Sequence, residues 1–92
     1  MIIRIFSDGQ YRIPEDAQAR LHELDAQTVN AVDAGDEEAF TSSYGALVEL
    51  IHSVGERLAD DELEPSDLML PPSDITLEEA REEFTGEGLI PD

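Results

Sequence analysis

The sequence predicts an α+β domain with the element order β-β-α-α-β-α. Three observations lead to this prediction. The first 13 residues are rich in β-branched and aromatic side chains around an Asp-Gly turn signal, two long stretches carry apolar residues at helical spacing, and a helix-capping sequence stands near the end. At 92 residues, the chain is expected to form one domain that spans residues 1–92.

Residues 1–13 are predicted to form a β-hairpin. Met1–Phe6 supplies the first strand, and Tyr11–Ile13 supplies the second. Between them, Asp8-Gly9 is a dipeptide that favours a tight hairpin turn. Because two strands alone are only marginally stable in water, the hairpin must pack against another part of the chain.

Residues 15–34 are predicted to form the first helix. Pro14 suits the start of a helix, where a missing N–H costs nothing, and Gly35 suits a left-handed residue at its end. One face of this helix carries small and apolar residues at three- and four-residue steps: Ala17, Leu21, Leu24, Thr28 and Ala31 or Val32.

Residues 37–54 are predicted to form a second helix, antiparallel to the first because the link between them is short. Asp36 is its expected N-cap and Gly55 its end. Its apolar stripe has the clearest periodicity in the chain: Phe40, Tyr44, Leu47, Ile51 and Val54. Since a three-stranded sheet is too small to cover two helices, we expect some valines to stay partly exposed and available to a partner: Val29, Val32 and Val48.

A third strand is predicted at Asp67–Leu70, at the edge of the hairpin. Its apolar run, Leu68-Met69-Leu70, is followed by Pro71-Pro72. Because proline has no N–H to donate, the two prolines would prevent the pairing from continuing.

A short third helix is predicted to follow and to extend to Phe84. Thr76 and Glu79 have the three-residue spacing of a capping box, in which each residue satisfies a backbone N–H of the first turn. The sequence leaves open whether the tail, residues 85–92, is ordered.

The composition excludes several classes of function. The chain has 23 Asp and Glu residues against five Arg and no Lys, and its formal net charge is −18. Phosphate contacts need basic side chains, so nucleic acid is not an expected partner. The absence of Cys excludes disulfides, thiolate metal sites and a cysteine nucleophile. No apolar run approaches the ~20 residues of a membrane-spanning helix, so direct membrane insertion is not expected.

The acidity itself has three interpretations, which the sequence leaves open. It is typical of a well-solvated surface in an organism that prefers Arg codons or has a salty cytoplasm. It would also suit docking onto a basic partner, with salt-sensitive attraction. Finally, carboxylates at phosphate-like spacing would make the protein a mimic of nucleic acid that inhibits a DNA-binding protein.

No residue pattern predicts a catalytic, cofactor or metal site. His22 and His52 each stand alone in a predicted helix, without the partners that nucleophilic catalysis or zinc binding needs. The acidic groups at 33–38 and 60–62 do not match the twelve-residue calcium loop. We therefore expect no enzyme activity and no cofactor, with a small carboxylate- or metal-dependent hydrolase as the alternative.

Four stretches, taken in order, give the chain its resemblance to a known family. They are the opening strand with Gly9-Gln10-Tyr11, the Ala34–Glu37 helix break, the acidic and proline-rich segment Asp60–Pro72, and Leu77-Glu78-Glu79. In their order and spacing they resemble the PspA-associated family, PspAA, over nearly the whole chain.

The resemblance implies a non-enzymatic accessory or regulatory protein of the phage-shock-protein A system. Its expected partner is a PspA-like coiled-coil protein, which assembles on stressed inner membranes. The resemblance thus implies a cytoplasmic protein, peripheral to the inner membrane through its partner. The absence of Lys and the strong acidity suit both a high-GC actinobacterium and an archaeon with a salty cytoplasm, and we expect the first. Whether the chain forms homo-oligomers stays open.

The acidic and proline-rich segment is the predicted partner contact, because carboxylates, apolar side chains and rigid prolines lie together there. Alternatively, its apolar residues only complete the sheet and its prolines only fix a loop. The predicted contact residues are Asp60, Asp61, Glu62, Glu64, Asp67, Leu68 and Leu70.

Overall fold

The fold is α+β and follows the predicted order, with one additional strand. A computed structural model describes residues 1–6, 8–59, 65 and 68–83. The elements in order are β1 (Ile2–Ile5), β2 (Gly9–Arg12), a 3₁₀ turn (Glu15–Ala17), α1 (Gln18–Ala34), α2 (Glu37–Val54), β3 (Glu56–Arg57), β4 (Leu68–Leu70) and α3 (Leu77–Glu83).

The four strands form one mixed sheet in the order β3-β2-β1-β4. The predicted hairpin is confirmed: β1 and β2 pair antiparallel, with Ile3 opposite Tyr11. The predicted third strand is confirmed as an edge strand, β4, which runs parallel to β1 and sets Leu70 beside Ile5. Strand β1 is therefore an interior strand with neighbours on both sides.

The additional strand, β3, was not predicted, because two residues are too few to show an alternating pattern. It pairs antiparallel with β2, so that Arg57 lies opposite Tyr11. Gly55 connects α2 to β3 where the backbone passes very close to the helix. A Cβ atom on Gly55 would lie 2.5 Å from the carbonyl oxygen of Ile51, so glycine allows the chain to enter the sheet directly after α2.

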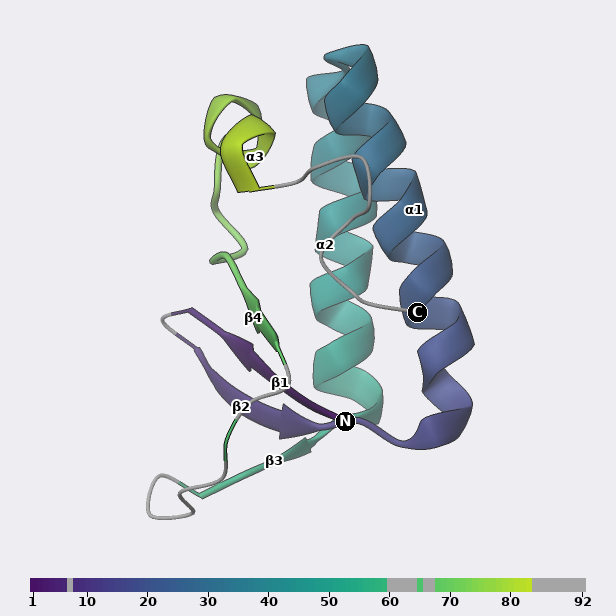
Figure 1. The fold of residues 1–92 in the computed structure, drawn as a ribbon, viewed down its shortest axis with the longest axis vertical. Coiled ribbons are helices and arrows are strands. Elements are labelled where there is room, and N and C mark those ends of the chain that lie inside the picture. Colours follow the sequence, from purple (N-terminus) through teal and green to yellow (C-terminus); the bar gives the residue numbers. More distant parts are fainter. Residues whose placement is uncertain (7, 60–64, 66–67, 84–92) are drawn as a thin grey trace.

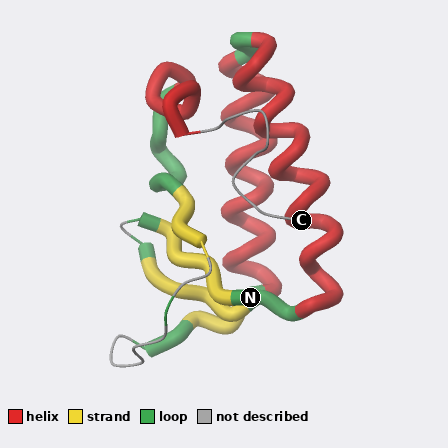
Figure 2. Tube along the Cα trace, in the orientation of Figure 1, coloured by secondary structure: helices red, strands yellow, loops and turns green. Residues whose placement is uncertain are grey.

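The two long helices cover one face of the sheet, as Figure 1 and Figure 2 show. Strand residues alternate between this face and the opposite one. Ile3, Ile5 and Tyr11 point inward and are buried, whereas Arg4 and Arg12 lie on the opposite face and are exposed. Among the described residues, the core therefore lies in a single layer between the sheet and the helices.

The helix hairpin has the predicted caps. Gly35 adopts a left-handed conformation with φ of 68°, and its N–H reaches back to the last turn of α1. Asp36 then caps α2, with its Oδ1 accepting from Ala39 N at 3.1 Å. The first predicted helix differs in its opening turn: residues 15–17 form a 3₁₀ turn, and α1 begins at Gln18. Such tight turns are frequent at helix starts.

The expectation that helix valines stay exposed is wrong. Val29, Val32 and Val48 are only 8%, 4% and 5% exposed, and all three belong to the core cluster. The helices bury these side chains because they pack on each other as well as on the sheet, and α3 adds its fully buried Ala80 to the same cluster. The helix hairpin thus offers little apolar surface to a partner. Val54, the last residue of α2 and of the predicted apolar stripe, is 37% exposed.

The predicted capping box starts α3. Glu79 N donates to Thr76 Oγ1 at 3.2 Å, and Glu79 Oε1 accepts from the Thr76 hydroxyl at 3.0 Å. Figure 1 shows α3 beside the helix hairpin, at the end away from the strands. The predicted end at Phe84 and the tail lie outside the described residues.

Candidate functional site

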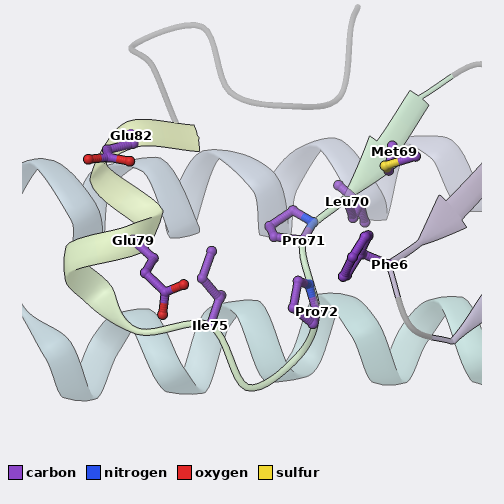
Figure 3. Close-up of a pocket in the computed structure, with 8 residues that line it drawn as sticks. All are labelled: Phe6, Met69, Leu70, Pro71, Pro72, Ile75, Glu79 and Glu82. Atoms are coloured by element: carbon purple, nitrogen blue, oxygen red, sulfur yellow. The ribbon is translucent and has the colours of Figure 1, made fainter.

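A groove between the sheet edge and α3 is the candidate site. It has a volume of about 380 Å³ and combines an apolar floor with acidic side chains at one end. We call it the β4–α3 groove, and Figure 3 shows the residues that line it: Phe6, Met69, Leu70, Pro71, Pro72, Ile75, Glu79 and Glu82.

The strand end of the groove presents two large apolar side chains to solvent. Phe6 is 57% exposed and Met69 is 56% exposed. Their position follows from the strand alternation: Ile5 and Leu70 point into the core, so that the residues next to them, Phe6 and Met69, point outward. Phe6 N donates to Leu70 O at 2.9 Å, which holds the two segments side by side.

The floor of the groove is a short segment that leads from β4 to α3. Pro71 and Pro72 begin it, and Ile75 N donates back to Pro72 O at 3.1 Å in a tight turn. The hydroxyl of Tyr44, on α2, donates to the carbonyl oxygen of Pro71. Fixed proline φ angles and this hydrogen bond make the floor a preformed surface.

The far end of the groove is acidic. Glu79 and Glu82 are both on α3, and both are exposed. The capping bonds from Thr76 go to Oε1 of Glu79, so a cationic group can approach Oε2 without breaking the cap. The groove thus combines an apolar floor, which can take up an apolar side chain, with carboxylates at one end, which can pair with a cationic group.

A second cluster, of titratable side chains, lies at the β1–β2 turn. Asp8 is at its centre: Oδ2 lies 2.6 Å from His52 Nε2, and Oδ1 accepts from the Tyr11 hydroxyl at 2.8 Å. Arg57 Nη2 donates to the backbone carbonyl of Asp8 at 3.1 Å, and its guanidinium lies 5.9 Å from the Tyr11 ring centre. The cluster ties the hairpin turn to the end of α2 and to β3.

These contacts shift two pKa values. Burial alone would raise the pKa of Asp8, but the hydrogen bonds from His52 and Tyr11, with the charges of His52 and Arg57, outweigh it and lower the pKa below its ordinary 3.8. For Tyr11, burial and the Asp8 hydrogen bond raise the pKa above its ordinary 10.0, against the opposing charge of Arg57. Both shifts favour the protonation states that the Tyr11–Asp8 hydrogen bond requires, an ionised Asp8 and a neutral Tyr11.

The predicted contact residues are only partly within the described chain. Leu68 is half-buried, and Leu70 is fully buried against Ile5, so the side chain of Leu70 serves the core. The exposed apolar residue between them is Met69, which sequence reasoning passed over although strand alternation could have identified it. The remaining predicted contact residues lie outside the described residues: Asp60, Asp61, Glu62, Glu64 and Asp67.

The histidines do not share a site: His22 is half-buried in α1, and His52 is in the Asp8 cluster. Within the described ranges, no three acidic or histidine side chains converge so that they could hold a metal ion. In the same part of the chain, no helix combines the length and the apolar character needed to cross a bilayer.

Comparison with known proteins gives one match. Among curated proteins and among solved structures, none matches this chain. The family model of PspAA, described as PspA-Associated protein, matches residues 1–92. The family name describes association with PspA rather than a reaction. The resemblance seen in the sequence is thereby confirmed: this chain belongs to the PspA-associated protein family, PspAA.

Proposed function

We propose that this protein is a non-enzymatic accessory partner of a PspA-like coiled-coil protein and regulates the membrane-stress response by binding to it. The observation that carries the proposal is the pair of exposed apolar side chains, Phe6 and Met69, in the β4–α3 groove. Isolated exposed apolar residues are common, but two that line one groove are typical of an interaction site. Membership of the family named for association with PspA supports the identity of the partner.

The contact is proposed to include the acidic segment that precedes β4, with Asp60, Asp61, Glu62, Glu64 and Asp67, and to continue over Leu68 and Met69 into the groove. The net charge of −18 favours a basic partner surface and disfavours direct contact with anionic lipid. The protein would therefore act in the cytoplasm and reach the inner membrane only through its partner.

Co-purification with the PspA-like protein of the same organism tests the proposal. We expect a complex at about 50 mM NaCl that weakens at about 500 mM, because salt screens exposed charges. Asp61→Lys should weaken binding and leave the circular dichroism spectrum unchanged. Asp33→Lys is the matched control, since it makes the same charge change at an exposed position near the end of α1. Absence of a complex at both salt concentrations would contradict the proposal.

A further inference from the structure

The β4–α3 groove is acidic at its α3 end, and an arginine lies beside its strand end without lining it. At the α3 end stand the carboxylates of Glu79 and Glu82. At the strand end, Arg4 of β1 is paired in register with Met69 of β4, and both are exposed on the same outer face of the sheet. The apolar floor lies between these two ends, as Figure 3 shows for the strand side and α3.

This arrangement is unusual for the chain, because Arg4 is one of only five arginines among 92 residues and the chain has no lysine. A chain with a net charge of −18 attracts any basic surface without needing an arginine at its binding site. An arginine next to the exposed Met69 therefore adds direction: it favours one end of a bound segment and repels the other.

We propose that the groove binds one segment of a partner protein in a fixed direction. The segment has Lys or Arg at the end that lies over α3, apolar side chains in the middle, and Asp or Glu at the end that lies over β1. This inference rests on the proposed function and specifies where and in which orientation the partner lies.

The apolar part of the binding energy comes from the middle of the groove. A partner side chain that enters it contacts Phe6 and Met69 on one side and Pro71, Pro72 and Ile75 on the floor. Because the prolines and the Tyr44 hydrogen bond fix this floor, little conformational entropy is lost when a partner binds. The charged ends then set the direction rather than most of the affinity.

A second copy of this chain is a less suitable occupant. Two copies would bring together net charges of −18 each, and their repulsion opposes association at low salt. A nucleic acid would be repelled for the same reason. The charges thus favour a different protein whose basic residues meet Glu79 and Glu82.

The first arm of the test measures the apolar contact. The dissociation constant for the PspA-like protein of the same organism is measured with Phe6→Ala and Met69→Ala. Because both side chains are exposed in the unbound chain, their removal should leave stability unchanged and weaken binding by about five- to thirtyfold. Val54→Ala is the matched control: it shortens another exposed apolar side chain outside the groove and should not alter binding.

The second arm tests direction through the sign of a charge effect. Glu82→Arg should weaken binding by about two- to fivefold, and Glu49→Arg, at an exposed position on α2, should weaken it less. Arg4→Glu makes the chain more acidic, so attraction by net charge alone would strengthen binding of a basic partner. The directed groove predicts the opposite, a loss of about two- to fivefold. Arg20→Glu makes the same change on α1 and should not weaken binding.

The outcomes separate the two proposals. If the complex forms but Phe6→Ala, Met69→Ala and Arg4→Glu bind as tightly as the natural chain, the groove inference is wrong and the proposed function stands. If no complex forms with the natural chain, the proposed function itself fails. If light scattering finds a dimer of this chain that Phe6→Ala dissociates, a second copy occupies the groove, and the inference is overturned.

Discussion

His52 Nε2 lies 2.6 Å from Asp8 Oδ2, although the two residues are 44 positions apart in the sequence. This contact joins the last turn of α2 to the turn between β1 and β2. Together with the Tyr11 hydroxyl and Arg57, it fixes the turn of the β-hairpin relative to α2 and β3.

The Asp8 contacts predict a stability difference that depends on pH. The folded pKa of Asp8 is below the unfolded value, so its contribution is fully present above about pH 3.8 and is lost as the pH falls through the folded pKa. We expect Asp8→Asn to lower the free energy of unfolding by about 1 kcal/mol at pH 6. As the pH falls below about 3.8 the difference should shrink, and it should vanish once Asp8 is protonated in the folded chain, because a protonated carboxyl resembles an amide. Urea unfolding at several pH values measures this.

Asp33→Asn is the control for that experiment, because Asp33 is exposed on α1 and remote in sequence from the cluster. It should change stability little at any pH. If the free energies of unfolding of Asp8→Asn and the natural chain differ by a constant amount from pH 6 to pH 3, the stabilising contacts of Asp8 do not depend on its ionised carboxylate.

Shortening the side chains of two adjacent residues of β4 should change the free energy of unfolding by very different amounts. Leu70 is fully buried, so Leu70→Ala should lower the free energy of unfolding by about 2–5 kcal/mol through lost burial and a new cavity. Met69→Ala removes an exposed side chain and should stay within about 0.5 kcal/mol of the natural chain. Chemical denaturation of both variants measures the contrast. Equal effects would mean that β4 does not have the observed register.

Gly35 provides a test of the helix hairpin. Its φ of 68° lies in the left-handed region, where a side chain adds steric cost. Gly35→Ala should therefore lower the free energy of unfolding by about 1 kcal/mol, and Gly35→Asn should cost less, since Asn tolerates this conformation better. Thermal unfolding ranks the three proteins. If Ala is as stable as Gly, the turn must be able to adopt another conformation.

Tyr44→Phe should loosen the floor of the groove without touching a bound partner. It removes the hydroxyl that donates to Pro71 O and leaves the stacked Phe40 and Tyr44 rings in place. We expect a loss of about 1 kcal/mol in stability and faster hydrogen exchange at Ile75 N, which belongs to the adjoining turn. Phe40→Leu is a useful comparison, because it disturbs the same core region but keeps the hydroxyl. Unchanged exchange in Tyr44→Phe would show that the prolines alone fix the floor.

Local signals in the sequence were sufficient for most of the fold. The capping residues Asp36 and Thr76, the turn at Asp8-Gly9 and the left-handed Gly35 each act within a few residues, so their chemistry can be read directly from the sequence. For the same reason the stripe from Phe40 to Ile51 was assigned to the core. Strand β3 could not be found this way, because it exists only through its pairing with Tyr11 and Arg12.

The groove and the Asp8 cluster depend on contacts between distant segments, and this is why the sequence did not predict them. Asp8 and His52 meet only after α2 has brought its end to the hairpin turn. Likewise, Phe6 and Met69 become neighbours only through the parallel pairing of β1 with β4. The expectation of exposed valines failed because it left out the packing of the helices on each other and on α3.

The position of β1 has a consequence for the order of events during synthesis. Its antiparallel neighbour lies a few residues away, but its parallel neighbour begins at Leu68. Until the ribosome has translated β4, one edge of β1 has no pairing strand. The backbone N–H and C=O groups of that edge then face water or other nascent chains. Premature termination before residue 68 would leave that edge of β1 unpaired. Such fragments should aggregate or be degraded rather than accumulate as a shorter folded protein.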